Sequence, residues 1–494
     1  MTAQFPHPEY ARLILQPAFG DARRLLFPHM MAANEAHVLM LQATGILSTD
    51  HAARMLKAIR VVADAGPSSV AYENDVEDLF FQVESQIIDI AGADAGGNLQ
   101  IARSRNDLDA VMCRMMLRDR LQTTGHRILD LRGTMIELVS RHIDSIMPGI
   151  THTQPAQPTT LAHYLLGVLG PLERDSQRLR AAFERTNICP LGAAAFTTSS
   201  FPIDRLKTAE LLGFDGIVVN GYDAVGAADH MLEATQVLVT LATSLGRFVN
   251  DLLIWARHEV GILRVAKAFV QISSIMPQKR NPVVLEHIRS RIGYVLGDAN
   301  TVQNMVHTAA FGDTVDVEDP IYVPLARTFD SADAVVTLLN VVLETIEINS
   351  ELLRSRAGEG FTTSTGLADG LVRDYGLPFR DAHAITSQSV RQAIAGDGSI
   401  TCGIVSEAAS QVRGEALSID AGWLESQLDP DAFVQARSVP GGPARSAVEQ
   451  AVADARALLG ADQYEMNNAT QRQKLAEAIR EGERERLIAT LGVG

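Results

Sequence analysis

The amino-acid sequence predicts an all-α protein built on a long central helical bundle, and three observations support this. Of the 494 residues, 46% are hydrophobic and only 5% are aromatic, which favours helices packed on helices over a β-sandwich. Several stretches of about 25 residues carry apolar side chains at steps of three or four, the period of a helix with one buried face. Between Asp107 and Leu353 no alternating run of apolar and polar residues extends beyond a few positions. Long helices without a pure heptad pattern are typical of an antiparallel bundle.

Charge and cysteine content limit the partners and the compartment. The net charge of −16 disfavours nucleic acid and anionic membranes as main partners, although a locally basic site can still bind an anionic small molecule. Cys113, Cys189 and Cys402 lie far apart, with neither metal-site spacing nor the pattern of a disulfide framework. The longest largely apolar run, Ala334–Ile346, is interrupted by polar residues and is too short to span a bilayer. We therefore expect a cytoplasmic protein without a signal peptide.

Residues 1–104 are expected to form a small N-terminal helical domain. Residues 35–63 read as two helices joined by the turn "TGILSTD", in which Gly45 and Ser48 are turn and cap residues. Residues 76–90 have apolar side chains at helical spacing and stop before the glycine-rich "AGADAGGN".

Residues 105–357 are expected to form the central bundle domain. Its clearest period includes Leu238, Leu241, Leu245 and Phe248, which follow one another at steps of three or four. The expected long helices are Asp107–Leu131, Leu161–Arg185, Asp229–His258, Val283–His307 and Asp330–Leu353.

Residues 358–494 are expected to form a separate C-terminal helical domain. The stretch "GEGFTTSTG", residues 358–366, is a joint rich in helix breakers, and shorter helices with more Gly and Pro follow it. The charged tail "NNATQRQKLAEAIREGERERLIATL" reads as an exposed terminal helix.

The loop "QISSIMPQKRNP", residues 271–282, combines reactive side chains with breakers just before an expected helix. We expect Asn281 to be the N-cap of this helix and Pro282 to lie in its first turn. A capped helix after an irregular loop is the plain structural interpretation. However, Ser273, Ser274 and Lys279 also precede the helix N-terminus, where backbone N–H groups favour an anion such as a carboxylate.

Two further polar loops complement this one. "ARSRND" precedes the first long helix, and "GITHTQPAQP" lies between the first two. Each loop alone is weak evidence, because such residues more often cap helices or face solvent. Together they provide carboxylate-binding and proton-transfer groups: Ser104, Arg105 and Asn106 in the first, and Thr151, His152 and Gln157 in the second.

These segments resemble the signature regions of the fumarase/aspartase superfamily. "SSIMPQKRNP" resembles its mobile-loop signature, and "ARSRND", "ITHTQPAQP", "PLGAAAFTTSSFPIDR", "LPFRDAH" and "FVQARSVPGGPA" resemble the argininosuccinate lyase branch. The likeness extends from about Glu35 to Ala444. It implies a mostly helical, three-domain subunit whose central helices form a twenty-helix core in a homotetramer. It also implies active sites that are each shared between three subunits.

The resemblance implies β-elimination from an aspartate-like dicarboxylate, which releases fumarate through an aci-carboxylate intermediate, without metal or cofactor. Ser273 matches the catalytic serine base, and Lys279 is expected to stabilise its alkoxide in a closed site. His152 matches the superfamily's histidine, and Glu286 matches the partner of that histidine, although a first-turn acidic residue is an equally good interpretation of Glu286. The expected substrate-binding residues are Ser104, Arg105, Asn106, Thr151, Gln157, Ser274, Met276, Asn281 and Asp313.

Several positions depart from the argininosuccinate lyase pattern. Ile272 stands where a Gly usually precedes the serine pair, Gln100 and Leu108 replace a His and a Gln around "ARSRND", and Ala228 replaces an Arg. In "FGDTVDVEDP", the best alignment places Phe311, Asp313 and Asp316 where the branch has a Tyr, a basic residue and a Gln. A reversed charge at a substrate contact changes what binds, so Asp313 or Asp316 could face a cationic amine. A solvated acidic loop is the alternative.

The sequence therefore predicts a carbon–nitrogen lyase that cleaves an N-substituted aspartate into fumarate and an amine other than arginine. Aminopolycarboxylates such as ethylenediamine-N,N′-disuccinate fit this description, and a lyase of this branch acts on that compound. Argininosuccinate lyase with unusual contacts is the alternative enzyme. A crystallin-like structural protein is the alternative from another class, but the joint presence of Ser273, His152, Lys279 and Asn281 disfavours it. A serine hydrolase is disfavoured, because the sequence has no G-x-S-x-G motif and the Ser273 loop lies next to prolines instead of a strand.

Overall fold

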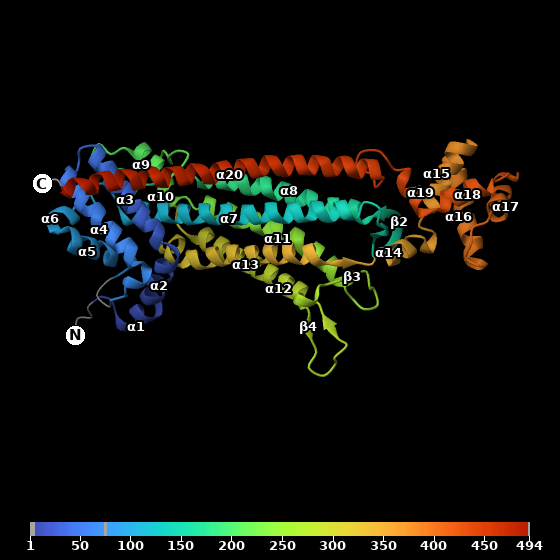
Figure 1. The fold of residues 1–494 in the computed structure, drawn as a ribbon, viewed down its shortest axis with the longest axis horizontal. Coiled ribbons are helices and arrows are strands. Elements are labelled where there is room, and N and C mark those ends of the chain that lie inside the picture. Colours follow the sequence, from blue (N-terminus) through green and yellow to red (C-terminus); the bar gives the residue numbers. More distant parts are fainter. Residues whose placement is uncertain (1–4, 74–76, 493–494) are drawn as a thin grey trace.

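A computed structural model describes residues 5–73 and 77–492. The molecule is elongated and mostly helical, with long helices side by side along its length and shorter helices clustered at both ends (Figure 1). The long helices are α7 (Arg105–Arg141), α8 (Leu161–Thr186), α11 (Asp229–Trp255), α12 (Val283–Thr308), α13 (Asp319–Thr345) and α20 (Arg445–Ala489).

The N-terminal helices pack at one end of the bundle. Ser48 caps the helix after the "TGILSTD" turn by accepting a hydrogen bond from the backbone of His51, and Gly45 has φ 74° in that turn, as expected. Asp78 caps the following helix, and residue 76, its expected start, lies outside the described residues. The elements here are α1 (Pro8–Tyr10), η1 (Ala11–Leu15), α2 (Gln16–Leu25), α3 (Phe27–Ala43), α4 (Thr49–Ala65), η2 (Pro67–Ser69), α5 (Leu79–Ala91) and α6 (Ala93–Gly96).

The expected bundle helices are confirmed in number and order, but α7 continues to Arg141, beyond its expected end at Leu131, and both ends of α13 are wrong. Instead of Asp330–Leu353, α13 spans Asp319–Thr345. Its early start follows from Pro320, whose fixed φ suits a first helical turn. Its early end occurs because Glu347–Ile348 forms strand β6, after which Asn349 caps the separate helix α14 (Ser350–Ala357).

Strands are present in the central region, contrary to the expectation of helices alone. β1 (Ile146–Thr151) and β2 (Gln154–Thr160) form an antiparallel hairpin that leads directly into α8, with Thr160 as its N-cap. The prolines in both strands conceal any alternating pattern, since proline is rare within paired strands. Two shorter antiparallel pairs join β3 (Leu263–Arg264) to β6 (Glu347–Ile348) and β4 (Gln271–Ile272) to β5 (Arg280–Asn281).

The helices after α14 have an apolar core of their own, with Leu367, Leu371, Ile385 and Leu424 among its buried members. They lie at the far end of the bundle from the N-terminal helices (Figure 1). The elements are η5 (Glu359–Phe361), α15 (Ser364–Tyr375), α16 (Phe379–Ala395), α17 (Cys402–Arg413), α18 (Ala421–Leu428) and α19 (Pro430–Gln435). The remaining short segments of the chain are α9 (Arg205–Leu211), α10 (Gly221–Gly226), η3 (Lys267–Phe269), η4 (Val315–Val317) and η6 (Thr490–Gly492).

The terminal helix α20 does not remain with this C-terminal cluster. Its 45 residues span roughly 68 Å, and it runs back along the bundle to the N-terminal helices (Figure 1). Buried Glu35 of α3 pairs there with Arg480 at 3.2 Å and with Arg484 at 2.7 Å. The tail is therefore helical, as expected, but it is docked rather than free. Residues 445–489 pack with the bundle, although the expected division assigns them to the C-terminal domain.

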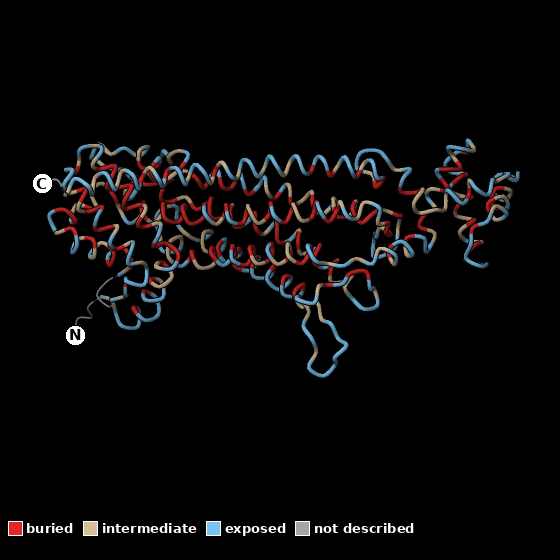
Figure 2. The backbone as a smooth tube through the Cα atoms, viewed as in Figure 1, coloured by how far each residue is buried: buried red, intermediate tan, exposed pale blue. Residues whose placement is uncertain are grey.

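Figure 2 shows the buried residues concentrated inside the bundle, while the arm around β4 and β5 is exposed. Helix α11 is long and apolar enough to cross a membrane, by length and composition alone. Its buried side chains, such as Leu238 and Leu245, belong to the main core of the bundle.

Candidate active site

The three polar loops predicted from the sequence lie at three separate places in the subunit. "ARSRND" begins α7, the "THTQ" turn follows the opposite end of α7, and the serine loop extends from the side of the bundle between β4 and β5 (Figure 1). Helix α7 has 37 residues and is roughly 55 Å long. Ser104 and Thr151 therefore cannot contact one substrate within a single chain.

At the start of α7, the expected residues form a connected cluster with Asp313. Ser104 is the N-cap, and its Oγ donates a hydrogen bond to Asn106 Oδ1 at 2.5 Å. Asn106 Nδ2 donates to Asp313 Oδ2, and Arg105 forms an ion pair with Asp78 at 2.6 Å. Three consecutive predicted residues are thus brought together with the exposed carboxylate of Asp313, which is distant in sequence, while Asp316 lies in the nearby turn η4.

Asp107 holds this cluster against the loop "PLGAAAF". Its carboxylate accepts hydrogen bonds from the backbone of Ser104 at 2.9 Å, Gly192 at 2.8 Å and Ala194 at 2.9 Å. Burial raises the pKa of Asp107 to about 6, and these hydrogen bonds oppose the rise. The residue is a positioning group that fixes the first turn of α7.

Buried carboxyl groups surround the same cluster, and sequence reasoning missed two of them. Burial raises the pKa of Glu318 to about 9, and its hydrogen bond with Asp313 adds to the effect. Burial also raises the pKa of Asp109 to about 7, although Tyr322 donates a hydrogen bond to it. Only the fold could identify these groups, because their proximity depends on the packing of α7 against α13.

Asp109 provides a test of this electrostatic environment. A carboxyl group with a raised folded-state pKa favours the neutral form, so the folded protein loses stability as the pH rises from 3.8 to about 7. Asp109→Asn is neutral at every pH and can still accept the hydrogen bond from Tyr322. We expect its Tm to exceed that of the wild type by roughly 1–3 °C at about pH 8, and the difference to disappear near pH 4. Thermal unfolding followed by circular dichroism measures this, and a Tm difference independent of pH would contradict it.

The hairpin after α7 carries the predicted histidine on a strained turn. His152 has φ 50° and Thr153 has φ 65°, backbone angles that residues other than glycine rarely adopt. His152 is exposed, and Gln157 Nε2 donates a hydrogen bond to Thr365 Oγ1 at 2.9 Å. Thr151 and Gln157 line a cavity of about 830 Å³ between the hairpin, α8, α11 and the start of α20.

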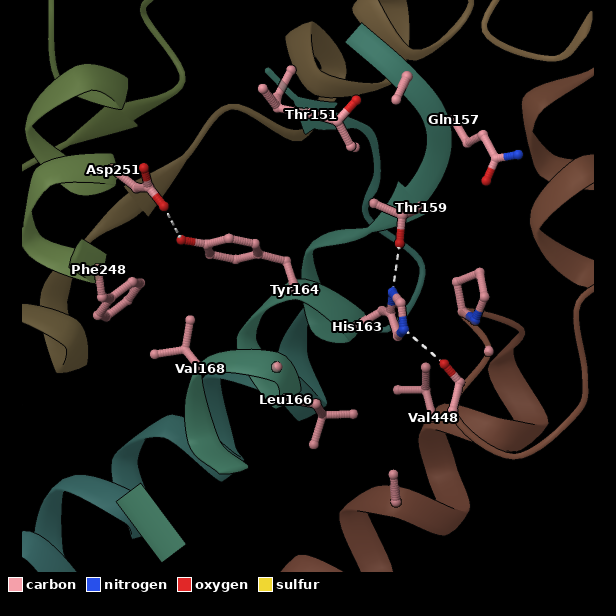
Figure 3. A pocket seen from close by; sticks show the side chains of 18 of the residues that line it. Thr151, Gln157, Thr159, His163, Tyr164, Leu166, Val168, Phe248, Asp251 and Val448 are labelled. Atoms are coloured by element: carbon pink, nitrogen blue, oxygen red, sulfur yellow. Dashed lines mark hydrogen bonds between the residues drawn. The ribbon is translucent and has the colours of Figure 1, made fainter. Parts of the chain in front are cut away.

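Figure 3 shows the polar contacts along this cavity. Tyr164 OH donates to Asp251 Oδ2 at 2.6 Å, which joins α8 to α11. His163 lies between Thr159 Oγ1, at 2.8 Å, and the carbonyl oxygen of Gly441, at 2.9 Å. These contacts secure the hairpin and the start of α20 against the bundle.

The serine loop is an exposed arm on a short β-ladder. Ser273 Oγ accepts hydrogen bonds from the backbone of Ile275 at 3.3 Å and Met276 at 3.0 Å, which fold the serine pair into a tight turn. The expectation that Asn281 caps α12 is wrong, because Asn281 pairs with Gln271 in the ladder and Pro282 takes the N-cap position.

The base of this arm forms a second cavity of about 1230 Å³. Four predicted residues line it: Met276, Lys279, Asn281 and Glu286. Glu286 is exposed in the first turn of α12. Ser273 and Ser274 lie further out on the arm, where Ser274 is exposed and Ser273 is half-buried.

Two protein-family models match this chain. A protein-family model described as "Lyase" matches residues 22–297, more than half of the chain. The chain belongs to the fumarase/aspartase superfamily of lyases. A second model, described as "Argininosuccinate lyase C-terminal", matches residues 361–435 of this superfamily member.

Curated relatives of this lyase match it over almost its whole length. Argininosuccinate lyase 2 of Agrobacterium fabrum is 35% identical over 473 residues, which cover 95% of this chain and 94% of the relative. Argininosuccinate lyase of Methanoculleus marisnigri is 36% identical over 446 residues, which cover 90% and 89%.

Solved structures agree with the fold. An EDDS lyase variant with bound fumarate superposes with a TM-score of 0.87 at 30% identity and covers 98% of this chain and 96% of that one. EDDS lyase in complex with formate gives the same TM-score and identity, with coverage of 99% and 97%. The protein is therefore a carbon–nitrogen lyase of the fumarase/aspartase superfamily.

Proposed function

We propose that this lyase cleaves the carbon–nitrogen bond of an N-substituted aspartate and releases fumarate and an amine other than arginine. The observation that carries this choice is the hydrogen bond from Asn106 to Asp313. It places a carboxylate among the predicted substrate-binding residues, at a position aligned with a different side chain in argininosuccinate lyases. An aminopolycarboxylate such as ethylenediamine-N,N′-disuccinate contains both the succinyl end and an amine, and a structural relative at 30% identity is described as an EDDS lyase.

The residue types suit a β-elimination. Ser273 takes a proton from the carbon next to a carboxylate, and the resulting aci-carboxylate carries two negative charges. The base is the alkoxide form of Ser273, which Lys279 and backbone N–H groups of the loop stabilise when the loop excludes water. The carbon–nitrogen bond then breaks, its electron pair passes to nitrogen, and fumarate forms. His152 assists the departing amine, Glu286 polarises His152, and the carboxylates are held by Ser104, Arg105, Asn106, Thr151, Gln157, Ser274, Met276 and Asn281.

Such chemistry requires more than one chain, and we propose a homotetramer with shared active sites. The most apolar window of α11 is less than half buried within the isolated subunit. On the neighbouring helix α12, Tyr294 is 52% exposed, and Gly293 and Gly297 have open space where a side chain would be. An exposed face of apolar and small side chains lets helices of other subunits approach closely.

Argininosuccinate lyase is the second candidate, and the names of curated relatives at 35% and 36% identity favour it. Argininosuccinate carries a guanidinium group and an amino-acid head. Loss of several hydrogen bonds to charged groups of that substrate, each worth about 1.5–3 kcal/mol, exceeds what the remaining contacts recover. The third candidate is a crystallin-like structural protein, which would release no fumarate.

Steady-state kinetics on a panel of N-substituted aspartates separates these candidates. We expect kcat/KM for argininosuccinate to be at least ~100-fold below that for the preferred substrate, a difference of about 2.7 kcal/mol. Fumarate absorbance measures both reactions in the same assay. Efficient turnover of argininosuccinate would establish the second candidate, and absence of fumarate from every member of the panel would leave the structural one.

A further inference from the structure

Three aromatic rings form an exposed patch beside the start of α7. Phe196, Tyr222 and Phe311 are 46%, 45% and 67% exposed. The rings of Tyr222 and Phe311 are stacked, with centroids 6.0 Å apart and planes at 7°, and Phe196 lies 5.0 Å from Tyr222. The rings come from three separate segments of the chain, so the fold has assembled them. Exposed clusters of this kind mark binding surfaces more often than isolated exposed side chains do.

The aromatic patch adjoins Asn106 and Asp313. Phe311 precedes Asp313 by two residues, and Gly226 of α10 packs closely on the backbone of Gly312 between them. A Cβ atom on Gly226 would lie 3.0 Å from the Gly312 nitrogen, so this close approach requires glycine. Phe311 and the carboxylate of Asp313 are therefore held on one short, supported loop, and the ring of Tyr222 stacks on Phe311.

Carboxyl groups give this region a negative character. Asp313 accepts a hydrogen bond from Asn106 and also hydrogen-bonds Glu318. Burial and this hydrogen bond raise the pKa of Glu318 to about 9, so Glu318 favours its protonated form at neutral pH and can donate this hydrogen bond to Asp313. The guanidinium of Arg105 pairs directly with Asp78 at 2.6 Å and Glu77 at 3.4 Å, and its charge acts on Glu318 only through space.

We propose that the aromatic patch and the Asp313–Glu318 pair bind the leaving amine and select an amine that carries a second cationic centre on a short apolar chain. This inference rests on the proposed function and names its substrate class. Aromatic faces attract cations and accommodate methylene groups, and a carboxylate pairs with an ammonium group. The same carboxyl groups repel a leaving amine that carries carboxylates of its own. Among the N-substituted aspartates of the proposed function, the preferred substrate is thus an N-(aminoalkyl)aspartate. A bis-succinylated diamine such as ethylenediamine-N,N′-disuccinate is a poorer member of the same class.

Two substrates of equal size test the selection directly. N-(2-aminoethyl)aspartate carries the second ammonium group, and N-propylaspartate replaces it with a methyl group. We expect kcat/KM to favour the aminoethyl compound by at least ~10-fold in the wild type. Asp313→Asn is expected to reduce this ratio to about 1–2, and Phe311→Leu to reduce it by roughly 3-fold. The ratio is internal to each variant, so a smaller fraction of folded enzyme does not change it.

A matched control uses an aromatic residue that is equally exposed but far away. Phe379 begins α16 in the C-terminal cluster and is 61% exposed, and Phe379→Leu is expected to keep the wild-type ratio. If both substrates release fumarate and neither Asp313→Asn nor Phe311→Leu changes the ratio, the inference fails while the proposed function stands. The same conclusion follows if Phe311→Leu weakens subunit association at an unchanged ratio. If neither substrate nor any other N-substituted aspartate releases fumarate, the proposed function fails and this inference fails with it.

Discussion

Replacing Ser273 with alanine is expected to lower kcat by several orders of magnitude and to leave substrate binding largely intact. A base removes its proton only in the transition state, so its loss affects kcat rather than ground-state affinity. The position of Ser273 supports a role in catalysis rather than in stability. Its side chain is half-buried on the arm between β4 and β5, and its side-chain hydrogen bonds within the described residues are with the backbone of its own turn, at Ile275 and Met276.

Fumarate absorbance gives kcat, and the inhibition constant of a non-reacting succinyl analogue gives binding. Ser290→Ala is a suitable control because Ser290 is exposed on α12, outside the predicted site residues, and we expect it to keep the wild-type rate. A Ser273→Ala variant that retains more than about a tenth of wild-type kcat, a loss under ~1.4 kcal/mol, would show that Ser273 is not the base.

The helical architecture could be predicted from sequence because periodicity is a local property. The starts of α8, α11 and α12 agree with the predicted residues, since each helix has a strong apolar period. The β1–β2 hairpin could not be predicted, because its proline-rich strands pair through the backbone and show no alternation. The path of α20 along the bundle could not be predicted from the sequence either. Its contacts, such as Arg480 with Glu35, join the two ends of the sequence and leave no local pattern.

The candidate site was only partly predictable for the same reason. Motif residues such as Ser104 and Asn106 could be recognised individually from the sequence. The hydrogen bond between Asn106 and Asp313, which joins two distant segments, is visible only in the structure. Glu318 and Asp109 carry no motif, because their altered pKa values come from burial against neighbouring helices. The spatial separation of the three loops also follows only from the fold, since sequence order does not reveal that α7 holds two of them at opposite ends.

This separation has a direct functional consequence. Ser273 lies on the arm at the side of the bundle, His152 at one end and Asn106 at the other (Figure 1). A single subunit cannot bring these residues to one substrate molecule. If all three act in one reaction, different subunits must supply them, and a serine-deficient chain can then cooperate with a histidine-deficient chain.

Mixing the two inactive variants Ser273→Ala and His152→Asn is therefore expected to restore activity. In randomly mixed tetramers, a site that takes its serine and its histidine from different chains receives both intact residues in about one case in four. We expect co-refolded or subunit-exchanged mixtures to recover up to roughly a quarter of wild-type kcat, although each variant alone has almost none. Fumarate release measures the recovery, and analytical ultracentrifugation of the same samples measures the oligomer. A fully active monomer, or mixed tetramers with no more activity than the parents, would contradict shared sites. Such a result would require one chain to bring its own arm, its hairpin and the start of α7 to one site, although α7 separates the last two by roughly 55 Å.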